Sequence, residues 1–277
     1  MNVDAMNIDV ALIPAAGKGK RMRPATNVMP KALLTVVDRP SIQWVVEEAV
    51  AAGATEIFLI VDPMAGSMVE DHFSVLGTLP GLEQVAVRSV IQHEAKGLGH
   101  AVLVGREAVG DRPFFCLLAD DLIPPGEAVL SDMAGAAERG TSVLSLHELA
   151  DELLASKGVV IPRSGVVDGV LEVGGAVEKP GIEHAPSNLG IQGRYLFMPE
   201  VFELLAGTEP GYGGEIQLTD AINQLGVRGA CRGVVTDTEL LDVGNPMAYL
   251  RATAVLASGS PDYGEGFRIM MKALLED

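Results

Sequence analysis

The chain has 277 residues, and 37 Asp and Glu against 20 Lys and Arg give it a formal net charge of −17 at pH 7. This acidic balance argues against a nucleic-acid backbone or an anionic membrane as partner, because both would repel the protein at long range. The length fits one large α/β domain or two smaller ones, with a sizeable core in either case.

The first residues, 1–10, contain no basic segment followed by an apolar one, and no later segment approaches the ~20 uninterrupted apolar residues of a membrane span. We therefore expect a soluble, cytoplasmic protein. Of the two cysteines, Cys116 lies in the apolar run FFCLL, and Cys231 lies in GACRG without metal-ligand spacing around it. A buried free thiol is expected for Cys116, and no disulfide framework is implied.

The first half of the chain alternates apolar runs with segments of helical periodicity. Apolar runs occupy 10–15, 56–61, 114–120 and 141–146, and helical patterns occupy 41–53 and 97–110. Strands that are apolar on both faces and separated by helices indicate a mainly parallel sheet covered on both sides. Gly53 is a plausible C-cap of the first helix. The predicted fold class is therefore α/β, with a Rossmann-like doubly wound, mainly parallel or mixed sheet.

Shorter, glycine-rich segments follow after about residue 145. The run 157–180 predicts strands and hairpins in or beside the sheet, and helices are expected over 215–226 and 267–277. No internal repeat, low-complexity tract or Pro/Ser-rich linker is visible in the sequence. One domain over 1–277 is therefore favoured over two tethered domains.

A basic loop follows the first predicted strand. The segment 13–31, IPAAGKGKRMRPATNVMPK, contains five of the 20 cations and no carboxylate. Its place after a strand puts it at the carboxyl edge of the sheet, where open α/β folds bind ligands. Gly17 and Gly19 permit positive φ and a close approach of the backbone to phosphate oxygens. We expect a small, highly charged anion at this loop.

Two common phosphate loops do not fit the segment. The dinucleotide fingerprint needs a third glycine where Met22 stands, and Pro24 interrupts the helix that should continue. The P-loop needs a glycine where Pro14 stands, and Ser or Thr where Arg21 stands. Taken alone, a Gly-x-Gly with basic neighbours also fits a solvated turn, and at this point that alternative is open.

The whole segment resembles the signature of the sugar-1-phosphate nucleotidylyltransferases, Gly-x-Gly-Thr-Arg-x-x-Pro-x-Thr followed by Pro-Lys. The positions that match in register are Gly17, Gly19, Arg21, Pro24, Thr26, Pro30 and Lys31. Similar stretches cover most of the chain, at 36–57, 92–102, 117–123, 157–160, 176–180, 185–195, 214–222 and 241–250. Within that family the chain is most similar to the bacterial glucose-1-phosphate uridylyltransferases.

This resemblance implies a nucleotidyltransferase architecture, like that of glycosyltransferase-A folds, with small C-terminal elaborations. The nucleotide-binding part would span about 8–145, the sugar-binding part about 146–245 and a C-terminal helical segment about 246–277. The activity implied is Mg²⁺-assisted formation of UDP-glucose and pyrophosphate from UTP and glucose 1-phosphate. Relatives are commonly dimers or tetramers, so a homo-oligomer with small-molecule substrates is expected. Such an enzyme must align two polyanions, which explains the basic loop.

By the same resemblance, Arg21 and Lys31 are catalytic and contact the triphosphate and its reacting α-phosphate. The backbone of the loop would hold the base and phosphates, at Ala15, Ala16, Gly17 and Gly19. Lys20 and Arg23 stand where relatives commonly have Thr and Leu, and no role is implied for either. For Lys20, a triphosphate contact and an exposed side chain are both open.

Gln92 matches the family glutamine that reads a pyrimidine edge through its amide, and Gly97 would let the base lie close to the backbone. These positions point to uracil or thymine, although Gln92 alone also fits a polar strand end. Two carboxylates, Asp120 and Asp121, follow a buried strand, where they suit a divalent metal or a turn cap. The resemblance makes Asp120 and Asp242 the Mg²⁺ ligands.

The sugar phosphate is assigned by resemblance to the second half of the chain. Glu178 of the Glu-Lys-Pro match would bind sugar hydroxyls, and Lys179 would pair with the phosphate; a merely solvated charged pair is the alternative. Further contacts would come from Asp121, Gly158 and Asn188.

Three functions remain open on the sequence alone. The first is the uridylyltransferase, and the second is a paralogue that uses dTTP or another nucleotide, or another sugar or cyclitol 1-phosphate. The third, from a different class, is a non-catalytic nucleotide-sugar binding protein. Retention of Arg21, Lys31, Asp120, Lys179 and Asp242 together argues against the third, because binding alone does not need every phosphate and metal group.

Overall fold

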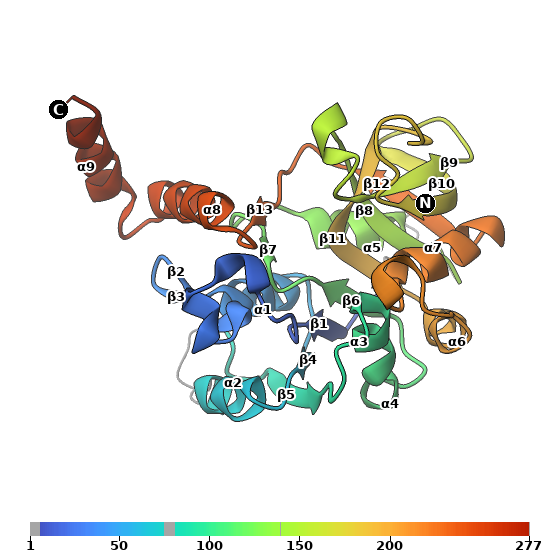
Figure 1. The fold of residues 1–277 in the computed structure, drawn as a ribbon, viewed down its shortest axis with the longest axis horizontal. Coiled ribbons are helices and arrows are strands. Elements are labelled where there is room, and N and C mark those ends of the chain that lie inside the picture. The colour runs from blue at the N-terminus through green and yellow to red at the C-terminus, as the bar shows by residue number, and fades with distance from the viewer. Residues whose placement is uncertain (1–5, 75–80, 139, 277) are drawn as a thin grey trace.

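A computed structural model describes residues 6–74, 81–138 and 140–276. Within them, the main sheet has nine strands in the order β5-β4-β1-β6-β11-β8-β12-β10-β9 (Figure 1). The prediction of an α/β fold with a mainly parallel or mixed sheet is confirmed. The single sheet runs through both predicted parts of the chain, whereas the division into those parts stays a prediction.

The first half of the sheet is parallel. Its strands are β1 (Val10–Pro14), β4 (Glu56–Val61), β5 (Ala86–Ile91) and β6 (Phe114–Leu117). β1 lies between β4 and β6, with Leu12 opposite Phe58 on one side and Cys116 on the other. β1, β4 and β6 are buried apolar runs of the sequence, and burial on both faces explains why they do not alternate with polar residues. β5, at the edge of the sheet, is only partly buried and was not among the predicted strands.

The second half of the sheet is mixed. Its strands are β8 (Ser142–Glu148), β9 (Gly158–Pro162), β10 (Val170–Glu178), β11 (Leu189–Phe197) and β12 (Cys231–Val235). β11 lies between β6 and β8 and is antiparallel to both, while β12 and β8 are parallel. β9 and β10 form the hairpin that the sequence predicted. The reversed β11 therefore joins the two halves.

Helices cover both faces of the sheet. The helices are α1 (Ser41–Ala51), α2 (Ala65–Ser74), α3 (Leu98–Val104), α4 (Arg106–Val109), α5 (Val129–Ala136), α6 (Glu200–Ala206), α7 (Leu218–Val227), α8 (Pro246–Gly259) and α9 (Gly264–Glu276). Ala11 and Ile13 of β1 pack in the core formed with α1, α2, α5 and α8. Val10 and Leu12 pack in a second core, on the other face of the sheet, with α3, α6 and α7. Alternate residues of β1 thus face opposite layers.

Helix boundaries correct two predictions. The pattern over 97–110 forms two helices that are separated at Gly105, where a Cβ would lie 2.0 Å from Leu12 Cδ1 of β1. The helix predicted over 215–226 begins only at Leu218, since the Ile216 backbone bonds Lys96 and Gly99 instead. The cap at Gly53 is confirmed by its φ of 103°.

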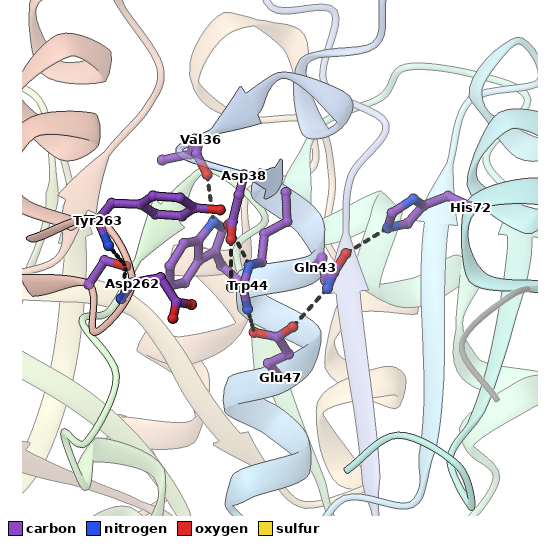
Figure 2. A network of polar contacts seen from close by, with 10 residues as sticks. Val36, Asp38, Gln43, Trp44, Glu47, His72, Asp262 and Tyr263 are labelled. Atoms are coloured by element: carbon purple, nitrogen blue, oxygen red, sulfur yellow. Dashed lines mark hydrogen bonds and ion pairs between the residues drawn. The ribbon is translucent and has the colours of Figure 1, made fainter. Parts of the chain in front are cut away.

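A polar network ties the start of α1 to its neighbours (Figure 2). Glu47 accepts hydrogen bonds from Arg39 Nη1 at 2.7 Å and Gln43 Nε2 at 2.8 Å, and the Arg39 guanidinium lies over the Trp44 ring. Gln43 also bonds the imidazole of His72 on α2. Arg39 belongs to β3 (Arg39–Pro40), which pairs with β2 (Thr35–Val36), so the network fixes this hairpin against α1.

The C-terminal helices differ from the others in position. α8 packs beside β13 (Leu241–Asp242), which pairs with β7 (Asp121–Leu122), whereas α9 extends away from the sheet (Figure 1). Both cysteines are buried and free, as predicted for Cys116. In the part of the chain described, no helix is long and apolar enough to cross a membrane.

Candidate active site

A cavity of about 610 Å³ opens at the carboxyl ends of β1 and β6. The predicted site residues that line it are Ala15, Ala16, Gly17, Gly19, Arg21, Lys31, Gln92, Gly97 and Asp120. These residues come from segments that are up to about a hundred positions apart, and the sheet brings them together. The remaining predicted site residues lie outside the lining, at Asp121, Gly158, Glu178, Lys179, Asn188 and Asp242.

The basic loop between β1 and α1 folds into three short 3₁₀ turns, Lys20–Met22, Ala25–Asn27 and Lys31–Leu33. Gly19 has a φ of 55°, and a Cβ there would lie 2.9 Å from Thr26 Cγ2. The carbonyl of Gly19 also accepts a hydrogen bond from Thr26 Oγ1 at 2.7 Å. Thus Gly19 and Thr26, both in the signature, hold the loop closed.

Gly17 behaves differently from Gly19. Only Gly19 of the pair has positive φ, and the space around Gly17 is open to 4 Å. Of the two glycines that could take positive φ, only Gly19 therefore does so. The lack of a side chain at Gly17 keeps this wall of the cavity clear.

The charged end of the cavity brings together residues from the loop and from two strand ends. Lys31 Nζ forms an ion pair with Asp120 Oδ2. A Cβ on Gly244 would lie 2.6 Å from Asp242 Oδ1, 2.9 Å from Arg21 Nη2 and 3.0 Å from Lys31 Nζ. Two cations and one carboxylate therefore surround a point that only a glycine at 244 leaves free, and Asp120 adjoins this group through Lys31.

The ion pair with Lys31 decides the charge state of Asp120. Burial by itself would raise the pKa of this carboxyl, but the attraction and hydrogen bond of Lys31 outweigh burial and hold the pKa below its usual value. Asp120 is thus a carboxylate at neutral pH, ready to bind a cation.

Asp121 lies behind Asp120 in a more enclosed place. Burial raises the pKa of its carboxyl; Lys157, whose Nζ is 4.0 Å from Asp121 Oδ1, opposes that shift, and Asp120 and Asp242 add to it. A Cβ on Gly193 would lie 2.6 Å from Asp121 Oδ2, so this carboxyl occupies space that a glycine provides. Asp121 does not line the cavity.

The opposite wall of the cavity contains Gln92 and Gly97. Gln92 follows β5 and is only 6% exposed. Gly97 has a φ of 99°, and a Cβ there would lie 2.7 Å from Glu215 Cβ and 2.8 Å from the Ile216 carbonyl oxygen. Glycine at 97 is therefore needed for packing against this segment, in addition to any approach of a base.

The predicted sugar residues gather around Glu178. Its Oε2 accepts a hydrogen bond from Thr219 Oγ1 at 2.6 Å, and its Oε1 pairs with Lys179 Nζ at 2.7 Å. A Cβ on Gly158, which is opposite Glu178 in the β9–β10 pair, would lie 3.4 Å from that carboxylate. Asn188 is exposed and precedes β11; its carbonyl accepts from the Leu149 backbone.

Sequence reasoning missed three residues beside the site. Each of the three lies in a stretch that resembles the family, at 157–160, 214–222 and 92–102, so a signal was available. Their contacts are seen only in the structure, Lys157 with Asp121, Thr219 with Glu178 and His100 with Gln92. Of the two unassigned cations, Lys20 lines the cavity and Arg23 does not.

Comparisons with known proteins agree with the family resemblance in the sequence. A family model described as nucleotidyl transferase matches residues 10–259. The chain is 39% identical to a UTP–glucose-1-phosphate uridylyltransferase from Pseudomonas aeruginosa, over 89% of this chain and 95% of that protein. One from Bacillus subtilis is 36% identical, over 96% of each. A solved UDP-glucose pyrophosphorylase complexed with UDP-glucose aligns with a TM-score of 0.83 and 35% identity, over 90% of this chain and 98% of that chain.

Proposed function

The chain belongs to the nucleotidyl transferase family, and from this premise we propose that it is a UTP–glucose-1-phosphate uridylyltransferase. A phosphate oxygen of glucose 1-phosphate attacks the α-phosphorus of UTP, the bond to the β-phosphate oxygen breaks, and pyrophosphate leaves with UDP-glucose as product. The observation that supports this reaction best is the convergence of Arg21, Lys31 and Asp120 at one end of a cavity large enough for a nucleotide, with Asp242 just outside its lining beside Gly244.

The nucleophile in this reaction is already an anion, so little general-base catalysis is needed. The main requirement is to hold two polyanions in line and to neutralise the charge that develops on the α-phosphate. Arg21 and Lys31 are the cations placed for that role, since both lie near the Gly244 backbone at the charged end of the cavity.

Asp120 and Asp242 are the residues that would hold Mg²⁺. Among the described residues, no group of three or more His, Cys, Asp and Glu could bind a metal by itself. Two carboxylates still fit Mg²⁺, which takes its other oxygens from substrate phosphates and water. Bound there, the ion would neutralise phosphate charge. Lys31 is the counter-charge of Asp120 at the place that Mg²⁺ would take. Its ammonium would therefore turn from Asp120 to the α-phosphate when the substrate binds.

The nucleotide would lie along the cavity between its charged end, at Arg21 and Lys31, and the opposite wall, at Gln92 and Gly97. Its phosphates would contact the loop backbone, at Ala15, Ala16, Gly17 and Gly19. Its base would lie against Gln92 and Gly97 at the far wall, because that wall has an amide and no cation among the predicted residues.

Glucose 1-phosphate would occupy the adjoining space at the ends of β9 and β10. Glu178 offers carboxylate oxygens to sugar hydroxyls, and Lys179 offers an ammonium to the phosphate. Gly158 keeps the strand surface open beside Glu178, and Asp121 and Asn188 complete the proposed contacts. Of these, Asn188 has the least structural support, since it is exposed and its carbonyl bonds the Leu149 backbone.

Release of pyrophosphate tests the function directly. The purified protein would be assayed with UTP, dTTP, CTP, ATP and GTP against glucose 1-phosphate, galactose 1-phosphate and inositol 1-phosphate. Highest turnover with UTP and glucose 1-phosphate is expected. Preference for another pair would identify a paralogue, and binding without turnover would identify a nucleotide-sugar binding protein.

We further propose that the protein is a homo-oligomer that assembles through α9. This helix exposes apolar side chains at Ile269, Met270, Leu274 and Leu275, with Leu275 82% exposed. An apolar helix face that extends away from the sheet is better explained by a second copy than by exposure to water. A cytoplasmic location stays a prediction from the sequence.

A further inference from the structure

The amide of Gln92 is held by two neighbours inside the cavity wall. Its Nε2 lies 2.8 Å from His100 Nδ1, on α3. The same nitrogen donates more weakly to the Gly97 carbonyl oxygen, at 3.5 Å. Gln92 is nearly buried and lines the cavity, so the orientation of its amide determines which polar atom the cavity contains.

The chemistry of these neighbours allows one orientation. A backbone carbonyl can only accept a hydrogen bond, so the group facing Gly97 must be the NH₂. An imidazole with its proton on Nε2 accepts at Nδ1, and takes the same NH₂. Turning the amide over would place the Gln92 oxygen against the Gly97 oxygen, two acceptors without a proton between them. The Gln92 Oε1 is therefore the atom offered to the cavity.

The surroundings of His100 favour the neutral ring that this arrangement needs. Burial lowers the pKa of His100, Lys96 lowers it further, and Glu94 opposes the shift. At neutral pH the ring is therefore uncharged, and its Nδ1 is free to accept from Gln92.

We propose that His100, assisted by the Gly97 carbonyl, is a positioning residue that makes the site select uracil over cytosine by presenting Gln92 Oε1 to the base. Uracil has a donor at N3, which an acceptor oxygen satisfies. Cytosine has a lone pair at N3, which the same oxygen repels. The inference rests on the proposed function, since it presumes a pyrimidine nucleoside triphosphate in this cavity.

The test compares His100→Leu, which fills similar space without an acceptor, with His100→Asn, whose Oδ1 can replace Nδ1. The readout is the ratio of kcat/KM for UTP to that for CTP, with glucose 1-phosphate as second substrate. Loss of one oriented base-edge contact should lower this ratio about 10- to 100-fold in His100→Leu. His100→Asn should recover most of it, and His93→Leu, at an exposed neighbouring histidine, should not change it.

Equal losses for UTP and CTP in His100→Leu would overturn the inference, as would an Asn variant no better than the Leu variant. If His100→Leu does not fold, His100→Ala serves in the same comparison. Dissociation constants of UTP and CTP, measured by calorimetry, give the same ratio without turnover. A wild-type protein that binds UTP over CTP but releases no pyrophosphate would contradict the proposed function, and leave the positioning role to be decided by the binding ratio of the variants.

Discussion

Arg194 and Glu48 form a buried bidentate ion pair behind the candidate active site. Arg194 Nε and Nη2 each donate to one Glu48 oxygen at 2.7 Å, and the arginine side chain has no exposed surface. Arg194 also donates to the carbonyl oxygens of Asp121 at 2.6 Å and Gly193 at 2.9 Å. The pair therefore connects α1, β11 and the turn that contains the two aspartates.

Removing the carboxylate of this pair should lower the free energy of unfolding. Glu48→Ala leaves a guanidinium buried without its counter-charge, which costs about 3–5 kcal/mol. Urea denaturation measures the loss. The matched control is Glu239→Ala, which breaks the exposed bidentate pair with Arg251 and should cost at most about 1 kcal/mol. Similar losses in both variants would contradict the structural role of Arg194.

Lys31→Met should reduce kcat far more than it weakens UTP binding. The ammonium is expected to act on charge that develops in the transition state, and loss of such a group lowers kcat about 10²- to 10³-fold. Steady-state kinetics and UTP calorimetry separate the two effects. Arg88→Met, at an exposed cation on the edge strand β5, is the control. Near-normal turnover in the Lys31 variant would refute the assignment.

Removal of divalent metal should abolish activity. A chelator is expected to stop pyrophosphate release, and added Mg²⁺ to restore it, because without the ion the carboxylates of Asp120 and Asp242 would repel the triphosphate. Asp120→Asn and Asp242→Asn should each need more Mg²⁺ for half-maximal rate, whereas Asp111→Asn, on an exposed loop, should not. Full activity in the presence of chelator would exclude the metal role.

The two signature glycines should respond differently to alanine. Gly19→Ala forces a side chain into positive φ and against Thr26, and should cost about 1–3 kcal/mol of stability. Gly17→Ala meets open space, so its stability should change by less than about 0.5 kcal/mol. Thermal unfolding measures both. Equal destabilisation would mean that the loop does not have the conformation described.

Both cysteines should resist thiol reagents in the native protein. Burial raises the pKa of Cys231 to about 12, and burial raises that of Cys116 further, although Arg194 opposes the shift. The reactive thiolate is therefore scarce at pH 8, and the thiols are also inaccessible. An aromatic disulfide reagent should report no free thiol in buffer and two in denaturant. Rapid reaction of a thiol in buffer would show local opening of β6 or β12.

Local patterns predicted the strands well and the helix ends less well. Runs such as EIFLIV are apolar because the strand they form is buried on both faces. Such a run can be recognised from a few consecutive residues. The start of α7 could not be predicted from the local sequence, because the Ile216 backbone bonds Lys96 and Gly99, which are distant in the chain. Helix boundaries of this kind depend on tertiary contacts that compete for the same backbone groups.

The sequence alone determined the family resemblance, the basic loop and the residues expected to meet the nucleotide, because signatures and apolar runs are local. Only the tertiary structure decided which residues meet. Lys31 and Asp120 are 89 positions apart, and Arg194 and Glu48 are 146 apart. Their pairing depends on β1 lying beside β6 and on β11 entering the sheet in reverse. It is this strand order, set by burial of both sheet faces, that brings the distant charges together.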